Sequence, residues 1–218
     1  MRTKISLCLF LLILIFPLRL AAESKEQAAI DAIQKRYEEV RTFQSDFVQK
    51  SYVKMMNQTQ KAEGRVHIKK PGKMKWVYNA PDPQVLVSNR ETLWLYVPED
   101  EQVTKVPIKN IYSSNTPALF LAGKGKLLDT FEVLQVIFRD QEVQVTLAPK
   151  NEENNLERLV LYADKKNYQI VGSSVYDKLG NRTEIRFRNI QVNREIPDQM
   201  FEFSVPQGVE LLDYTEKP

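Results

Sequence analysis

Hydrophobic and polar residues alternate along the stretch from Ala62 to Val97, the most strongly patterned part of the chain. Such alternation is typical of strands with one buried face. The pattern comes in three segments, Val66–Ile68, Met74–Tyr78 and Leu93–Tyr96. Residues typical of turns separate these segments. In the last segment both phases are apolar, so we expect a cover on each face of that strand. The stretch therefore predicts an antiparallel meander.

A helix is predicted ahead of this meander. Ser24 and Gln27 fit a capping box at its start. Apolar residues then recur at helical spacing on one face, namely Ala29, Ile33, Tyr37, Val40, Phe43 and Phe47. We expect this helix to pack on the sheet, with an aromatic end that covers more than ordinary core.

A second helix is predicted downstream, short and nearly all apolar. Asn115 or Thr116 can cap it, Pro117 lies in its first turn, and Gly123 ends it. A helix of this kind between strands must lie against the sheet or plug its opening. Further strands are predicted over residues 47–53, 103–108, 131–138, 143–147, 156–163, 168–176 and 183–192, with a last one in the tail.

The whole pattern contains no linker and no clear repeat. About ten strands and two helices in one unbroken run predict a single curved antiparallel sheet, closed or half closed into a barrel. A strongly bent sheet has a concave face, and helices over that face make a pocket instead of a filled core.

Residues 1–22 are predicted to be a secretory signal peptide. Arg2 and Lys4 precede an apolar run over residues 5–16, and Ala21–Ala22 supply the small residues that a signal peptidase needs. The run is short for a bilayer span, and a retained anchor is the alternative. We expect one domain over residues 23–218, in the compartment to which the signal exports it.

Composition argues against catalysis and against nucleic acid. Removal of Arg2, Lys4 and Arg19 with the signal takes the formal charge from +3 to zero, so electrostatic binding to nucleic acid is not expected. Cys8 is the only cysteine and leaves with the signal. His67, the only histidine, is expected to point to solvent. We therefore predict no enzyme, no metal site and no cofactor.

Five motifs in sequence order resemble the LolA-type periplasmic carriers of outer-membrane lipoproteins. They are Thr42–Lys50, Gly64 with Lys69–Trp76, Val87–Tyr96, Asn115–Pro117 and Phe201–Val209. The resemblance implies an unclosed β-barrel with helices as a lid over a hydrophobic cavity for lipoprotein acyl chains. It also implies that an inner-membrane ABC-type lipoprotein-releasing transporter loads a monomeric carrier, which delivers to an outer-membrane lipoprotein acceptor.

Release of such cargo sets a requirement on the lid. One long acyl chain represents on the order of 10 kcal/mol of burial, so the lid must fill the empty cavity to keep the net gain small. The candidates for lid filling are Phe43, Phe47, Leu119, Phe120 and Leu121. The candidates for cavity wall are Met74, Trp76, Leu93 and Leu95. Ordinary core packing is the alternative for each of them.

Lys70 is the candidate lid latch. It stands where the family usually has an Arg that is thought to hold the lid closed through backbone carbonyls. Lysine lacks the planar fork of arginine, so the latch is weaker, Lys69 shares it, or Lys70 is one more solvated charge. Met74 replaces the family Phe with a softer apolar group. A lipoprotein or lipid sensor on the same scaffold is the alternative function.

Overall fold

The fold comes from a computed structural model that describes residues 17–79, 81–108, 127–150 and 155–215, with backbone alone for 17–24 and 127. The predicted helix over residues 117–122, with Leu119, Phe120 and Leu121, lies outside this part of the chain. Residues 1–16 of the predicted signal peptide lie outside it too. Within the described ranges, no helix has both the length and the apolar character that a bilayer crossing requires.

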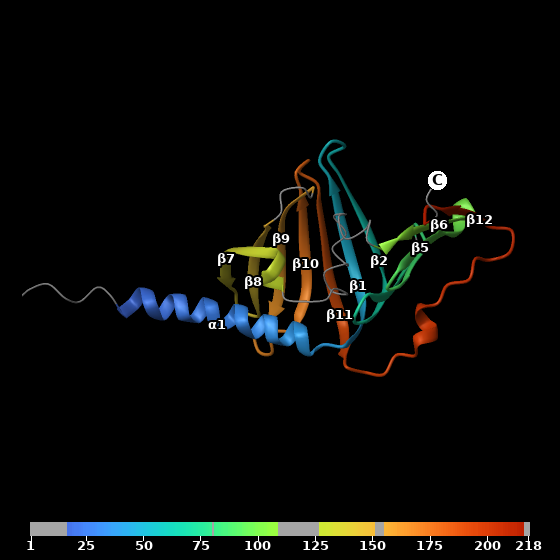
Figure 1. The fold of residues 1–218 in the computed structure, drawn as a ribbon. Coiled ribbons are helices and arrows are strands. Elements are labelled where there is room, and N and C mark those ends of the chain that lie inside the picture. The colour runs from blue at the N-terminus through green and yellow to red at the C-terminus, as the bar shows by residue number, and fades with distance from the viewer. Residues whose placement is uncertain (1–16, 80, 109–126, 151–154, 216–218) are drawn as a thin grey trace, which may run out of the picture.

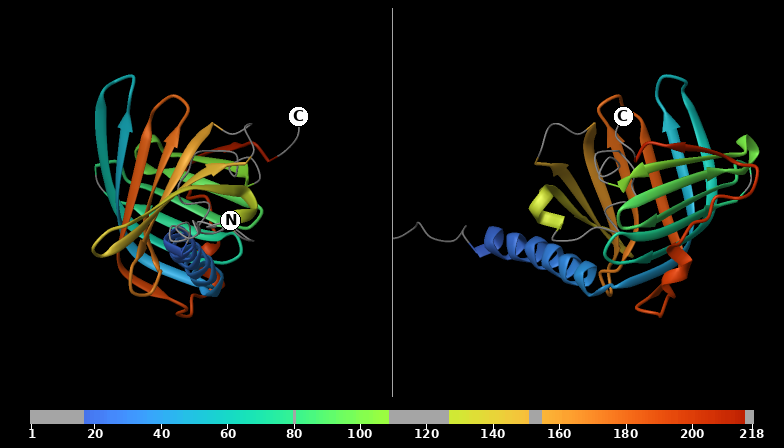
Figure 2. Two further views of the ribbon diagram at one scale, coloured as in Figure 1. Left: turned by 90° about the vertical axis from the view of Figure 1, so that its left-hand side faces the viewer. Right: turned by 45° about the vertical axis from the view of Figure 1, so that its right-hand side comes forward.

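Twelve strands form one sheet, which wraps into an open trough (Figures 1 and 2). The first six strands are β1 (Thr42–Val53), β2 (Gln58–Lys69), β3 (Lys73–Tyr78), β4 (Gln84–Asn89), β5 (Thr92–Val97) and β6 (Gln102–Pro107). The others are β7 (Phe131–Phe138), β8 (Glu142–Pro149), β9 (Leu156–Asp164), β10 (Ile170–Asp177), β11 (Arg182–Val192) and β12 (Glu210–Asp213). Three further helical elements are α3 (Leu127–Thr130), η1 (Pro98–Asp100) and η3 (Asp198–Phe201).

The strand order is β12-β6-β5-β4-β3-β2-β1-β11-β10-β9-β8-β7, with β12 and β7 at the two ends. This confirms the predicted single, strongly curved and unclosed sheet. The prediction that it is antiparallel throughout is wrong at one edge, because β12 pairs with β6 in parallel. The chain reaches that edge from η3 along the outside of the trough, and this route brings β12 alongside β6 in the same direction (Figure 1).

The first helix differs from the prediction at both ends. α1 spans Pro17–Glu39, so it starts ahead of Ser24 and continues through the predicted cleavage site after Ala22. It ends before Phe43 and Phe47, which lie in β1. A spacing of four residues also keeps two side chains on one face of a strand, so the two aromatic residues fit either pattern. β4 was not among the predicted segments, because its three consecutive apolar residues do not alternate.

A bulge bends the sheet between β1 and β11. β11 carries an extra residue opposite Ser45, where the register passes from Gln44↔Gln191 to Asp46↔Arg188. The hydroxyl of Ser45 donates to the carbonyl oxygen of Arg188 at 2.6 Å and so stabilises the bulge. Bulges of this kind bend a strand and increase its twist.

Gly64 on β2 allows the backbone of β3 and a side chain of β1 to approach closely. A Cβ at this position would lie 1.9 Å from the carbonyl oxygen of Val77 and 3.0 Å from the ring of Phe47. Any larger residue would therefore push β3 and the Phe47 ring away from β2. Phe47 on β1 and Tyr78 on β3, which belong to the aromatic wall described below, are the register partners of this glycine.

Each face of the sheet has a core of its own. On the concave face, apolar residues from β1, β2, β3, β8, β9 and β11 form one continuous cluster with α1. On the convex face, the chain after β11 runs across β3–β6, and Ile196 and Phe201 of this segment are fully buried. The ring of Phe203 stacks on Trp94 with centroids 6.2 Å apart. The expectation of a cover for both phases of β5 is thus confirmed.

Candidate functional site

The C-terminal part of α1 lies along one end of the trough, and its N-terminal part projects beyond the sheet (Figures 1 and 2). Ala29, Ile30, Ile33 and Tyr37 are buried there, at the spacing that puts them on one side of a helix. Hydrogen bonds between residues four apart stiffen the polar side, as from Gln34 to Glu38 at 2.7 Å. The concave face is therefore closed by a helix that contributes side chains but no backbone pairing.

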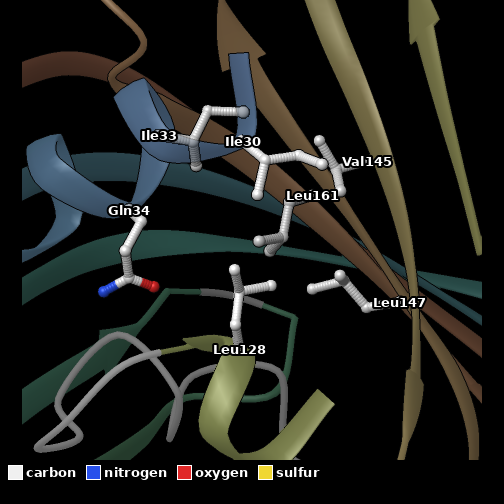
Figure 3. A pocket seen from close by; sticks show the side chains of 7 residues that line it. All are labelled: Ile30, Ile33, Gln34, Leu128, Val145, Leu147 and Leu161. Atoms are coloured by element: carbon white, nitrogen blue, oxygen red, sulfur yellow. The ribbon is translucent and has the colours of Figure 1, made fainter. Parts of the chain in front are cut away.

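A small apolar pocket remains beneath α1 (Figure 3). It holds about 260 Å³ of empty space, the part open to solvent included. Its lining consists of Ile30, Ile33, Gln34, Leu128, Val145, Leu147 and Leu161. Most of that space is open or lies between side chains, and the enclosed part has room for about one water molecule. A long alkyl chain therefore does not fit beneath α1 while the helix stays in place.

The aromatic wall of the trough is built on β1, β3 and β11. The ring of Phe47 contacts Trp76 and Tyr78 edge to face, each at a centroid distance of 5.0 Å. Phe43 contacts Phe187 in the same geometry at 5.1 Å. Edge-to-face packing lets the rings fill the floor of the trough closely.

The predicted lid residues Phe43 and Phe47 are therefore part of the sheet, and their assignment to the covering helix is wrong. Met74, Trp76 and Leu93 are buried on the concave face, and Leu95 packs there half-buried. The side-chain N–H of Trp76 and the hydroxyl of Ser173 are buried and have no hydrogen-bond partner among the described residues. The role of these residues as cavity wall stays a prediction, because burial is equally a property of ordinary core.

Lys70 meets the last turn of α1. Its ammonium donates to the carbonyl oxygen of Tyr37 at 2.6 Å and lies 3.3 Å from the centroid of the Tyr37 ring. Carbonyls in the last turn of a helix have no partner within the helix, and the negative end of the helix dipole favours a cation there. Burial lowers the pKa of Lys70 to about 8, and the charge of Glu38 acts in the opposite direction.

Two other side chains hold the same end of α1. Asn193, which follows β11, donates to the carbonyl oxygen of Glu39 at 3.1 Å and accepts from the backbone N–H of Arg41 at 2.8 Å. Its φ of +57° is one that asparagine tolerates better than most residues. Arg36 donates to the side chain of Gln169 at 3.1 Å. Farther toward the N-terminus of α1, the ammonium of Lys25 lies 4.4 Å from the centroid of the Phe138 ring.

Lys69 contacts the other cover of the sheet. Its ammonium donates to the carbonyl oxygen of Ile196 at 2.9 Å and lies 2.6 Å from a carboxylate oxygen of Asp198. Lys73 reaches the second oxygen of the same carboxylate at 3.1 Å. The two lysines beside the turn thus serve different covers, Lys70 the helix and Lys69 the C-terminal segment.

His67 is on the opposite face from Val66 and Ile68, as expected, but it does not simply point to solvent. Its Nδ1 is buried and has no hydrogen-bond partner within the described part of the chain. Burial lowers its pKa, and the charges of Arg65 and Lys75 add to that effect. Nothing in the local alternation indicates this burial. Among the described residues, no group of His, Cys, Asp and Glu side chains has the arrangement of a metal site.

The fold and the site together define a class, the open β-barrels whose apolar concave face is covered by a helix. The chain belongs to the LolA family, described as outer membrane lipoprotein carrier protein LolA, whose sequence profile matches residues 38–204. The matched residues include Lys70 and the aromatic wall, whereas most of α1 precedes them.

Individual relatives extend the match over more of the chain. An outer-membrane lipoprotein carrier protein of Nitrosospira multiformis is 27% identical over 214 residues, which cover 97% of this chain and 99% of the relative. One of Chromohalobacter salexigens is 33% identical over 80% of this chain and 82% of its own length. The crystal structure of an uncharacterized conserved protein from Thermus thermophilus has the same fold, with a TM-score of 0.53 at 10% identity over 87% of this chain and 99% of the other.

Proposed function

We propose that the chain is a periplasmic carrier that takes up the acyl chains of lipoproteins between α1 and the concave face of the sheet. The observation that carries the proposal is a continuous apolar face covered by a helix whose C-terminal end is held by Lys70 and Asn193. Membership of the lipoprotein carrier family supports it, as do relatives that are named outer-membrane lipoprotein carrier proteins.

The burial of α1 accounts for reversible binding. Four side chains of the helix and its C-terminal end, Ile30, Ile33, Tyr37 and Val40, are buried against the sheet. At about 2 kcal/mol each, they offset most of the roughly 10 kcal/mol that a buried acyl chain represents. Cargo that displaces the helix therefore replaces one set of apolar contacts with another. The net affinity stays low enough for release.

Within this proposal, Phe43, Phe47 and Trp76 line the acyl site, and Lys70 holds the helix in the closed state. Cargo is delivered by an inner-membrane ABC-type lipoprotein-releasing transporter and passed to an outer-membrane acceptor. In the same proposal, residues 1–22 direct export and are then removed, so that the mature protein begins at Glu23. N-terminal sequencing of the periplasmic fraction tests that boundary directly.

Native mass spectrometry of the protein co-expressed with an acylated lipoprotein tests the carrier function. We expect a complex with one intact lipoprotein, and no complex with a matched cargo whose acylated cysteine is replaced by serine. Incubation with outer-membrane vesicles should then release the cargo. Equal binding of both cargo forms would contradict the proposal. A complex that forms but never releases its cargo would favour a sensor instead.

A further inference from the structure

Two hairpin tips stand side by side at one end of the sheet. They belong to the β1–β2 hairpin and the β10–β11 hairpin, and they project beyond the neighbouring strands, at the end opposite α1 (Figures 1 and 2). The backbone N–H of Lys54 donates to the side-chain oxygen of Asn181 at 3.0 Å and joins them. We call residues 54–57 and 178–181 the paired tips.

The paired tips expose three large apolar side chains. The side chains of Met55, Leu179 and Met56 are 94%, 77% and 52% exposed. Met55 and Leu179 are the two most exposed large hydrophobic residues in the described part of the chain. Turn positions normally carry polar residues, and exposed apolar residues that gather at one place mark an interaction site.

Ordered turns hold these side chains outward. The backbone N–H of Asn57 donates to the carbonyl oxygen of Lys54 at 3.1 Å, and the hydroxyl of Tyr52 donates to the Asn57 side chain at 3.1 Å. In the second tip, a carboxylate oxygen of Asp177 accepts from the backbone N–H groups of Leu179 and Asn181. The turns depend on these polar groups and on nothing that methionine or leucine provides.

Exposed cations flank the apolar side chains. Lys50 and Lys61 lie directly opposite each other in the β1–β2 register, an arrangement of like charges that destabilises a sheet. Lys54 lies in the tip, and Arg182 follows the second one. On its other side Lys50 faces Glu184, whose carboxylate is already paired with Arg186 at 3.0 Å. The positive charge around the tips therefore serves something other than the stability of the sheet.

We propose that the paired tips dock on a bilayer that contains anionic phospholipid. Met55, Met56 and Leu179 enter the boundary between headgroups and acyl chains, while the flanking lysines contact phosphate groups, the combination that holds peripheral proteins on such membranes. A bilayer fits better than a protein partner, because the apolar side chains protrude from a convex tip and form no groove for an anchor residue. Docking by this surface is independent of the acyl site and goes beyond the carrier function.

Flotation with lipid vesicles tests the docking surface. The full-length mature protein is mixed with vesicles of phosphatidylethanolamine and phosphatidylglycerol, or of phosphatidylcholine alone. The test variant combines Met55→Ser, Met56→Ser and Leu179→Ser, and Leu134→Ser is the matched control, since Leu134 is 55% exposed on β7. A second variant combines Lys50→Gln, Lys54→Gln and Lys61→Gln.

Wild type and Leu134→Ser should float with the anionic vesicles. The triple serine variant should bind these vesicles at least about tenfold more weakly than wild type. The glutamine variant should lose the preference for anionic vesicles. Undiminished flotation of the serine variant, or no flotation of wild type, would overturn the proposal. Binding of an acylated peptide should be equal in all variants, so a failure of docking is distinguishable from a failure of the acyl site.

Discussion

Two segments cover the two faces of the sheet, and they are attached differently. The concave face is covered by α1, which adds no strand and leaves a pocket of about 260 Å³ beneath it. The convex face is covered by residues 194–209, which bury Phe201 and are held to β2 and β3 by Lys69 and Lys73 through Asp198. The chain then pairs with β6 as strand β12.

In the proposed function, this difference separates a removable cover, α1, from a permanent one. The convex segment combines backbone pairing, ion pairs and a fully buried ring, so its displacement would break several kinds of contact together. The helix depends on side-chain burial and on a few hydrogen bonds near its C-terminal end. In the proposed function, α1 swings away from the sheet about residues 40–41, which join it to β1 and which we call the hinge.

The largest expected effect comes from the permanent cover. Phe201→Ala should lower the free energy of unfolding by about 3–5 kcal/mol, because the buried ring leaves a cavity against β3 and β4. Urea denaturation measures the loss. Uptake of a fluorescent acylated peptide by the folded fraction should be unchanged. A clear loss of uptake at full folding would contradict the division between the two covers.

In the removable cover, a shorter buried side chain should lower the stability of the fold and raise the affinity for cargo. Ile33→Ala should cost about 2–3 kcal/mol of stability, less than in a sealed core because the residue already borders the pocket. The same change should raise the affinity for an acylated peptide by on the order of tenfold, because fewer protein contacts compete with cargo. Ile33→Val is the graded control. Weaker binding by Ile33→Ala would show that Ile33 contacts cargo instead of competing with it.

The latch should make uptake depend on pH. Burial lowers the pKa of Lys70 from 10.5 to about 8 in the closed form, whereas a displaced helix returns the ammonium to water. Between a pH of about 8 and 10.5, Lys70 is protonated in the open form and largely neutral in the closed form. The open form therefore binds more protons, and a rising pH favours the closed form. Affinity for an acylated peptide should therefore fall, by at most about tenfold per pH unit. Titration of binding from about pH 7 to about pH 10 measures the slope.

Lys70→Arg is the matched control for that slope, because arginine stays charged over the whole range. The variant should show a flat profile, and its planar donor groups should favour the closed form and slow uptake at neutral pH. Equal uptake rates in wild type and Lys70→Arg at neutral pH would exclude Lys70 as a latch. Parallel slopes would assign the pH dependence to other groups.

The smallest effect is expected at the hinge. Asn193→Ala should cost about 1–2 kcal/mol, because it removes the side chain that caps the Glu39 carbonyl and adds strain at a positive φ. Asn193→Gly loses the same hydrogen bonds without that strain and should cost less. Thermal unfolding of the two variants separates the contributions. Equal losses would show that the hydrogen bonds alone matter.

Local patterns were enough to predict much of the sheet. The bounds predicted for β7 agree with the structure, and the two apolar phases of β5 indicated that both faces are covered. The end of α1 was placed too late, because residues spaced four apart fit helix and strand alike. The missed strand β4 has apolar residues in succession, which alternation cannot detect.

The contacts of the candidate site depend on residues far apart in sequence. The importance of Asn193 follows only from the fold, because it contacts Glu39 from 154 positions away. The family resemblance pointed to Lys70, whereas the pocket beneath α1 lies over β8 and β9, which no predicted site residue occupies. Periodicity identifies which side chains are buried, and the fold alone brings them together.

The most direct test of the removable cover is a distance between spin labels. Ala28→Cys on the exposed side of α1 and Gln141→Cys between β7 and β8 form one pair, and Glu202→Cys with Gln141→Cys forms the control pair. Binding of an acylated peptide should lengthen and broaden the first distance and leave the second unchanged. An unchanged first distance with cargo fully bound would contradict the claim that α1 moves aside.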